Sequence, residues 1–381
     1  MIEPQFFYTK LLQQGTDFFT GVPDSLLKSF CAYITDHTPE HNHIIAVNEG
    51  AAIALASGYH LATGKIPLVY MQNSGIGNAI NPLLSLADPD VYRIPVLLVI
   101  GWRGEPGVHD EPQHLKQGKV TCALLEAMGI PFVIMSDSTA ELEKQITEGY
   151  AYSTEKNAPF AFVVRKDTFA AYTLRKNTEL AGNHDRMELE MSREEAIEEI
   201  ICSSDRDAVF FSTTGMASRE LYELRETHGM GHEQDFLTVG SMGHASQIAL
   251  AVALQNPRRS VTCLDGDGAL LMHTGALGTI GVRKPGKYRH IVLNNGAHDS
   301  VGGQPTIAFQ IDLCALARAC GYRNVYAVHT KAQLHSVLSQ AQDGTTFIEV
   351  CIHKGARNDL GRPCSTPEEN KKAFMLFLSN L

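Results

Sequence analysis

Short apolar runs alternate with helical patterns along this 381-residue chain, and this alternation constrains its fold more than any other feature. Such alternation is typical of parallel sheets joined by crossover helices. Six runs fall in the first half, at 18–20, 44–46, 67–71, 96–100, 132–134 and 160–164. Six more fall in the second half, at 208–212, 236–238, 260–264, 290–293, 324–328 and 347–352. The sequence therefore predicts an α/β protein with two doubly wound parallel-sheet domains.

A polar segment separates the two sets of runs. Residues 175–190 contain a Gly-Asn pair and show no apolar period, which is typical of a linker. We therefore expect one domain at 1–174 and a second at 191–381. With 44% apolar and 19% charged residues, the chain can bury a full core in each domain.

Charge and composition exclude several functions. A formal net charge of -10 argues against a nucleic-acid partner, and an anionic substrate would need a local basic cluster. The chain contains no run of eighteen apolar residues, and its N-terminus lacks a signal-peptide pattern, so we expect a cytoplasmic protein with no membrane partner. The eight cysteines form no Cys-x-x-Cys pair, which favours reduced, buried thiols over disulfides or zinc sites.

Two motifs follow neighbouring apolar runs in the second half. One is Gly266-Asp267-Gly268, and the other ends with Asn295. Because parallel strands end at one edge of a sheet, the carboxylate and the carboxamide can converge on a hard cation there. Oxygen ligands favour Mg²⁺ over Zn²⁺. The sequence thus predicts a magnesium diphosphate site, although each motif alone is also a common turn.

The phosphate would lie against backbone amides. Gly266 and Gly268 allow those amides to approach a ligand closely. A helix is expected over 269–280, and its N-terminus at Ala269 favours a phosphate group.

The paired motifs resemble the G-D-G…N-N signature of thiamine diphosphate-dependent enzymes. The resemblance covers essentially the whole chain and implies thiamine diphosphate and Mg²⁺ as cofactors. It also implies that Asp267, Asn295 and the carbonyl of Ala297 hold the cation. The chain has no room for the middle domain found in many members of that family, so the compact two-domain members are the better comparison. Those enzymes are homo-oligomers with active sites at subunit interfaces, which is our expectation here.

Glu49 opens the helix that is expected after the second strand. A glutamate is favoured in any first helical turn through the helix dipole, so a purely structural role is one interpretation. The resemblance implies the other: Glu49 bonds a pyrimidine nitrogen and activates the cofactor.

Further loops with small residues are expected to contact the cofactor. The resemblance implies that Met242 supports the bent cofactor and that the Gly240 carbonyl accepts its amino group. The complete set of expected cofactor contacts is Glu49, Asn73, Thr213, Gly215, Gly240, Ser241, Met242, Gly266, Asp267, Gly268, Ala269 and Asn295.

Three loops in the first half are expected to define the substrate. They lie at 21–25, 72–78 and 101–114, and a loop as long as the last is usually functional. An arginine offers a fork for anionic oxygens, and histidines can transfer protons. We expect substrate contacts from Asp24, Ser25, Arg103 and Gln113, and proton transfer by His109, His114 or His298. The alternative is a solvated lid with scattered charges.

These loops, together with residues 294–305, resemble those of two-domain decarboxylases. The resemblance implies decarboxylation of the small molecule phosphonopyruvate in phosphonate biosynthesis. Sulfopyruvate, which carries a sulfonate in place of the phosphonate, is the alternative substrate. A non-catalytic cofactor-binding protein on the same fold is a third interpretation, and Glu49 argues against it because binding alone does not need that carboxylate.

Overall fold

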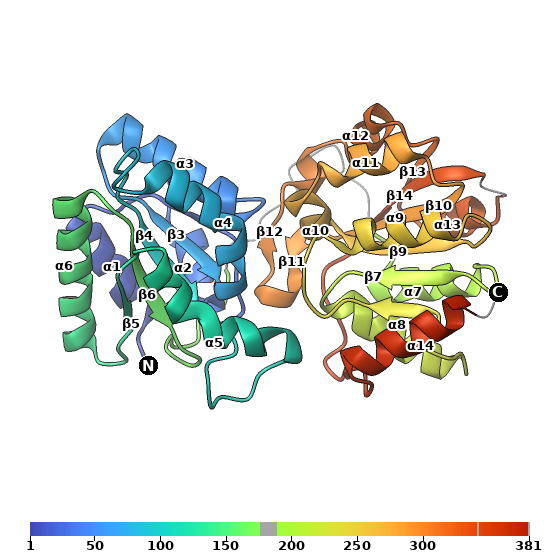
Figure 1. The fold of residues 1–381 in the computed structure, drawn as a ribbon, viewed down its shortest axis with the longest axis horizontal. Coiled ribbons are helices and arrows are strands. Elements are labelled where there is room, and N and C mark those ends of the chain that lie inside the picture. The colour runs from blue at the N-terminus through green and yellow to red at the C-terminus, as the bar shows by residue number, and fades with distance from the viewer. Residues whose placement is uncertain (176–188, 341–342, 380–381) are drawn as a thin grey trace. The chain divides into compact units, whose positions relative to one another are not determined.

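Each half of the chain is built around one six-stranded parallel sheet (Figure 1). The computed structural model describes residues 1–175, 189–340 and 343–379. The chain divides into two compact units: Met1–Asn177 with Ser300–Gln304, and Thr178–Asp299 with Pro305–Leu381. Most of the predicted linker at 175–190 lies outside the described residues, so its boundaries stay a prediction. Within the described ranges, no helix combines the length and apolarity needed to cross a membrane.

The first sheet has the strand order β2-β1-β3-β4-β6-β5. Its strands are β1 (Phe19–Gly21), β2 (His43–Ile45), β3 (Leu68–Gln72), β4 (Leu97–Gly101), β5 (Phe132–Ile134) and β6 (Phe160–Val164). Every residue of β4 and β6 is buried, as expected for central parallel strands covered on both faces.

Two helical layers cover this sheet (Figure 1). One layer contains α1 (Pro4–Gln14), α2 (Lys28–His37) and α6 (Thr139–Lys156). The other contains α3 (Glu49–Thr63), α4 (Ile76–Pro82) and α5 (Pro112–Ala127). On the first face, Phe7 packs its ring against Phe30 and Phe162, with ring centroids 5.0 and 5.8 Å apart.

The second sheet has the order β13-β14-β10-β9-β7-β8. Its strands are β7 (Val209–Ser212), β8 (Asp235–Leu237), β9 (Val261–Gly266), β10 (Lys287–Asn294), β13 (Asn324–Val328) and β14 (Gly344–Cys351). A small two-stranded sheet joins β11 (Ala297–His298) to β12 (Gln304–Pro305).

Helices also cover the second sheet on both sides (Figure 1). One layer contains α7 (Arg193–Cys202), α8 (Met216–Thr227) and α13 (Lys331–Leu338). The other contains α9 (Ala245–Gln255), α11 (Ala276–Arg283) and α12 (Leu313–Cys320). The last helix, α14 (Pro367–Ser379), packs Phe374 against Phe236 of β8.

The predicted fold class is confirmed, and each of the predicted strands is present with ends shifted by at most a few residues. The single helix expected over 269–280 is wrong. The chain instead forms α10 (Asp267–Met272) and then α11. Between them, the Thr274 hydroxyl bonds back to the carbonyls of Leu270 and Leu271, and Gly275 follows. A back-bonded threonine beside a glycine is a poor helix interior, which accounts for the break.

Candidate active site

Asp267 is a buried carboxylate at the point where β9 ends and α10 begins. The Thr306 hydroxyl donates a hydrogen bond to its Oδ2. Burial raises the pKa of Asp267 to about 7, and the hydrogen bond from Thr306 opposes this rise. A nearby cation would stabilise the charged carboxylate, so the residue fits the predicted metal ligand.

Asn295 lies just beyond β10 in a tight turn. Its Oδ1 accepts the backbone N–H of Ala297 at 3.0 Å, and its Nδ2 donates to Asp299 Oδ2 at 3.3 Å. Both Asn295 and Ala297 are buried. The two predicted oxygen ligands of this segment are therefore held within one turn, and their chemistry fits a hard cation.

The side chain of the neighbouring Asn294 bonds to the sheet and to the turn. Its side chain donates to Glu349 Oε1 of β14 at 2.7 Å and accepts the N–H of Gly296 at 3.0 Å. These bonds fasten the start of the turn to the sheet, so the first asparagine of the pair is structural.

A series of hydrogen-bonded, buried polar side chains supports the loop that carries Asp267. Asp265 accepts the Gly266 N–H at 3.0 Å through Oδ1, and its Oδ2 lies 3.1 Å from His290 Nε2. His290 Nδ1 in turn lies 3.0 Å from the Tyr322 hydroxyl. These contacts join β9 to β10 inside the core and fix the end of β9, directly before Asp267.

Gly268 lies close to two side chains of the predicted site. A Cβ added there would lie 3.2 Å from the His298 ring and 3.4 Å from Met242 Cε, so a side chain would crowd both groups. At Gly266 the nearest atom would be Thr213 Cγ2 at an ordinary 3.9 Å. The structure thus brings His298 and Met242 to the Asp267 loop. Burial lowers the pKa of His298 to about 4, so its imidazole is neutral near pH 7.

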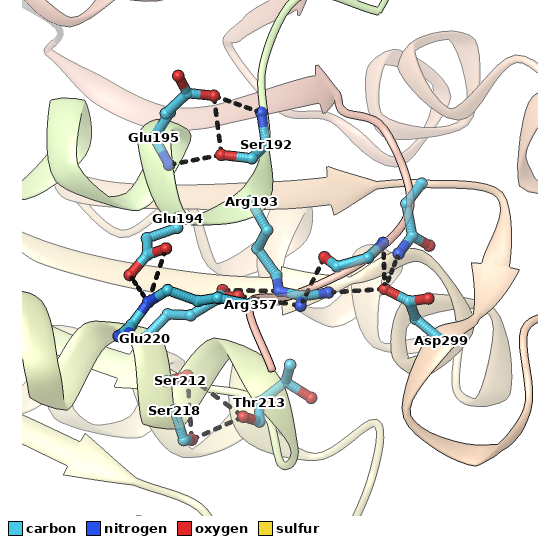
Figure 2. Close-up of polar contacts among 12 residues, drawn as sticks. Ser192, Arg193, Glu194, Glu195, Ser212, Thr213, Ser218, Glu220, Asp299 and Arg357 are labelled. Atoms are coloured by element: carbon cyan, nitrogen blue, oxygen red, sulfur yellow. Dashed lines mark hydrogen bonds and ion pairs between the residues drawn. The ribbon is translucent and has the colours of Figure 1, made fainter. Parts of the chain in front are cut away.

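The loops after β7 and β8 are tied together. Thr214 donates its hydroxyl hydrogen to the Val239 carbonyl at 2.8 Å. Thr213 is buried, and its carbonyl accepts the Ser218 hydroxyl at 2.8 Å (Figure 2). Gly215 has a φ of 101° and Ser241 a φ of 53°. A left-handed conformation is uncommon for serine.

In the first unit, Glu49 is the first residue of α3. Asn48 caps this helix by accepting the Ala51 N–H at 2.8 Å. Glu49 is only 5% exposed, and Asn78 donates to its Oε2 at 2.8 Å. Burial raises the pKa of Glu49, partly offset by this hydrogen bond. A Cβ on Gly75 would lie 2.3 Å from Glu49 Oε1, so only glycine leaves room for the carboxylate.

Arg103 is paired with the carboxylate of Asp110. Its Nε donates to Asp110 Oδ2 at 2.8 Å, and a second guanidinium nitrogen also bonds Asp110. Nη1 donates to the predicted substrate residue Ser25 at 2.6 Å. Asn73 donates to the Arg103 carbonyl at 2.8 Å and so anchors the start of this loop, and its expected contact with the cofactor stays a prediction.

Asp24 is a second buried carboxylate in this unit. The Leu26 N–H donates to its Oδ2 at 2.8 Å, and burial raises the pKa of Asp24 to about 6. Among the described residues, neither Asp24 Oδ1 nor Gln113 Oε1 has a hydrogen-bond partner. Both are buried acceptors that a protonated or donor group of a substrate would satisfy.

The long loop is shorter than expected. Helix α5 begins at Pro112, so Gln113 and His114 lie in its first turn and the loop ends before them. Burial lowers the pKa of His114, and the nearby charge of Arg103 lowers it further. His109 lies exposed in the loop, and its proton-transfer role stays a prediction.

Comparisons with known proteins agree with this architecture. A family model for the thiamine pyrophosphate enzyme N-terminal TPP binding domain matches residues 5–123, and the corresponding C-terminal TPP binding domain model matches residues 213–350. These matches and the two sheets define a thiamine pyrophosphate enzyme.

Individual relatives narrow the class. The chain is 36% identical to a phosphonopyruvate decarboxylase of Streptomyces viridochromogenes over 96% of its own length and 92% of the relative. It is 35% identical to a phosphonopyruvate decarboxylase of Streptomyces hygroscopicus, covering 95% and 90% of the two chains. A sulfopyruvate decarboxylase of Methanosarcina acetivorans is 29% identical, with 95% and 94% covered. The chain belongs to the family of thiamine pyrophosphate-dependent 2-oxo acid decarboxylases that contains these enzymes.

Proposed function

We propose that this protein is a Mg²⁺- and thiamine diphosphate-dependent enzyme that converts phosphonopyruvate to phosphonoacetaldehyde and carbon dioxide. The observation that carries this proposal is the near full-length identity of 36% to a relative named phosphonopyruvate decarboxylase. The buried Glu49 supports a catalytic role over simple cofactor storage, because an unneeded buried carboxylate would only destabilise the fold.

The second unit would hold the cation and the diphosphate. Asp267, Asn295 and the Ala297 carbonyl supply oxygen ligands, and Gly268 allows the close approach of a phosphate group. When bound, the thiazolium ring supplies an electron sink for the pair released as carbon dioxide leaves. The protein contributes position and charge.

Glu49 would exchange a proton with a pyrimidine nitrogen. The raised pKa of Glu49 brings its carboxyl group closer to the working pH, and this favours proton transfer. Asn78 fixes the orientation of the carboxyl group through its hydrogen bond. We propose further that Met242 and Gly240 orient the bound cofactor, and that the loops at Thr213, Gly215 and Ser241 line its site.

Residues of the first unit would bind the substrate. Arg103 would bind the phosphonate, with Ser25 and Gln113 beside it. Asp24, whose pKa lies near 6, would exchange a proton with a substrate oxygen. His109, His114 and His298 are the candidates for delivering the proton that replaces carbon dioxide. His298, whose pKa lies near 4, would have to take up a proton before it could deliver one.

We also propose a homo-oligomer in which neighbouring subunits complete each site. Glu49 and Asp267 belong to different units of the chain, so one cofactor needs both units. The pyrimidine residues of one subunit would serve the diphosphate residues of its neighbour.

Sulfopyruvate is the second candidate substrate. The relative from Methanosarcina acetivorans supports it with near full-length similarity, although at 29% identity it ranks below the two Streptomyces relatives. A sulfonate and a phosphonate are both tetrahedral groups with anionic oxygens at neutral pH, so the same arginine can bind either.

The decisive experiment measures carbon dioxide release from phosphonopyruvate, sulfopyruvate and pyruvate, each with and without Mg²⁺ and thiamine diphosphate. We expect turnover of phosphonopyruvate to exceed that of the other two acids and to require both additions. Preferred turnover of sulfopyruvate would replace the proposed substrate, and inactivity on all three acids would overturn the decarboxylase proposal.

A further inference from the structure

Asp299 connects the proposed cation site to a buried ion-pair network. It lies four residues after Asn295 in the sequence, and its Oδ2 accepts hydrogen bonds from three donors. These are Asn295 Nδ2 at 3.3 Å, the Gly355 N–H at 2.9 Å and Arg193 Nη1 at 3.4 Å. Figure 2 shows Arg193 and Asp299 pointing toward each other from separate elements.

Arg193 is held firmly at its other side. Its Nε donates to Glu220 Oε2 at 2.7 Å, and its Nη2 donates to Glu220 Oε1 at 3.0 Å. Both side chains are buried, with 9% and 1% exposed. A bidentate pair of this kind fixes the plane of the guanidinium, so the direction of Nη1 toward Asp299 is fixed as well.

The contacts of Asn295 settle which end of its carboxamide faces which neighbour. A carboxylate can only accept hydrogen bonds, and a backbone N–H can only donate them. The amide nitrogen must therefore face Asp299, and Oδ1 must face the N–H of Ala297. Rotating the amide by half a turn would set oxygen against oxygen and N–H against N–H.

We propose that Asp299, anchored by Arg193 and Glu220, is a positioning residue that fixes the carboxamide of Asn295. In this orientation one lone pair of Oδ1 accepts the Ala297 N–H and the second is available to the cation. This inference rests on the cation role proposed for Asn295. The chain of contacts runs from Glu220 through Arg193 and Asp299 to the carboxamide. Groups that orient a ligand in this way change metal affinity by roughly 10- to 100-fold when they are removed.

The test is a titration of Mn²⁺ into protein saturated with thiamine diphosphate, with free Mn²⁺ followed by electron paramagnetic resonance. We expect Asp299→Ala to raise the Kd for Mn²⁺ by roughly 10- to 100-fold. Asp299→Asn should give an intermediate value, because its amide oxygen can still accept from Asn295 while the charge for Arg193 is lost. This conservative variant also serves if the alanine variant does not fold.

The matched control is Asp312→Ala in the same unit. Asp312 caps α12 by accepting the Ala315 N–H at 2.7 Å, so its loss should lower the thermal midpoint. It should leave the Kd for Mn²⁺ within about twofold, because it lies outside the network. A purely structural Asp299 would behave like this control: a lowered midpoint with unchanged Mn²⁺ affinity in both Asp299 variants would overturn the inference.

Asp267→Ala separates this inference from the proposed function. If Asp267→Ala abolishes Mn²⁺ binding while both Asp299 variants bind normally, the cation site stands and the positioning role is wrong. If Asp267→Ala also binds Mn²⁺ with unchanged affinity, the cation site itself is wrong, and the positioning role is overturned with it.

Discussion

Thr306 donates its hydroxyl hydrogen to the buried carboxylate of Asp267. The two residues are 39 positions apart in the sequence. The backbone N–H of Thr306 also donates a hydrogen bond to the Gly296 carbonyl at 2.9 Å. The segment after β10 therefore reaches back to the end of β9. This contact links the two halves of the G-D-G…N-N pattern within one unit.

The first prediction compares the two partners. Asp267→Ala should lose thiamine diphosphate binding in Mg²⁺ buffer, because the cation loses its charged ligand and the diphosphate meets the acidic protein unscreened. Thr306→Val keeps the carboxylate and loses only the hydroxyl, so we expect affinity to fall about tenfold. Calorimetric titration of cofactor measures both, and unchanged affinity in Asp267→Ala would refute the assigned site.

The second prediction concerns Glu49. Glu49→Gln should still bind the cofactor, since the amide keeps its shape, but it cannot exchange the proton. Turnover should fall by at least about 100-fold, the usual scale for losing an acid or base. The control is Glu141→Gln, a glutamate in the exposed first turn of α6. If Glu49 served only the helix dipole, both variants would keep nearly normal activity.

The third prediction is a pH dependence set by Asp24. The pKa of its buried carboxyl is raised from 3.8 to about 6, so the folded state binds the proton more tightly than the unfolded state. The free energy of unfolding should therefore rise as the pH falls from about 6 to about 4, by at most about 1.4 kcal/mol per pH unit. Asp24→Asn removes this contribution.

Urea unfolding of cofactor-free protein at pH 4.5 and pH 7, values on the two sides of the pKa of about 6, tests this dependence. The difference between wild type and Asp24→Asn is the useful quantity, because other groups, including the buried Asp235, are present in both proteins. We expect wild type to gain stability relative to the variant at the lower pH. A constant difference would show that Asp24 stays ionised in the folded state.

The sequence predicted the sheets well because the strand signals are local. The five-residue runs of β4 and β6 define fully buried strands, whereas the three-residue runs of β2 and β5 form strands that are only partly buried. The residues after each run mark the edge where ligands collect. Asp267 and Glu49 were predicted as site residues for this reason: each stands at the first position after a strand or at the start of a helix. Their burial and raised pKa values then followed from the packing around them.

The missed residues depend on contacts between distant positions. Asp299 meets Arg193 across 106 positions, and no local spacing indicates that pairing. Asn78 was within a loop that the sequence analysis singled out, but its contact with Glu49 depends on how α3 packs against α4. The helix break at Thr274 was missed because its hydroxyl competes with the backbone, which an apolar period does not reveal.

The fourth prediction is that two inactive variants complement each other. Glu49→Gln and Asp267→Ala damage different units of the chain, so a mixed dimer would contain one intact site and one doubly defective site. Mixing them under conditions of subunit exchange should restore part of the activity. Fluorescent labels on the two variants verify the exchange, and exchange without recovery would mean that each site is completed within one chain.

The last prediction concerns Arg103 and the anionic end of the substrate. Within the described residues, Asp110 takes two N–H groups of the guanidinium and Ser25 takes a third. One N–H on each terminal nitrogen then remains for a tetrahedral anion. Lysine keeps the charge but loses this planar fork and the pairing with Asp110, so the change is not conservative.

Arg103→Lys should therefore lower kcat/KM for phosphonopyruvate. The corresponding loss of transition-state stabilisation should be about 1.5–3 kcal/mol, the scale of a hydrogen bond to a charged group. Weak activity on pyruvate, which has no phosphonate, should change little. Arg165→Lys is the matched control, because Arg165 is a more exposed arginine of the same unit paired with Glu105 at 2.8 Å. Asp110→Asn keeps the arginine and should cause a smaller loss than Arg103→Lys. An equal loss on phosphonopyruvate and pyruvate would show that Arg103 supports the fold of the loop and does not bind the substrate.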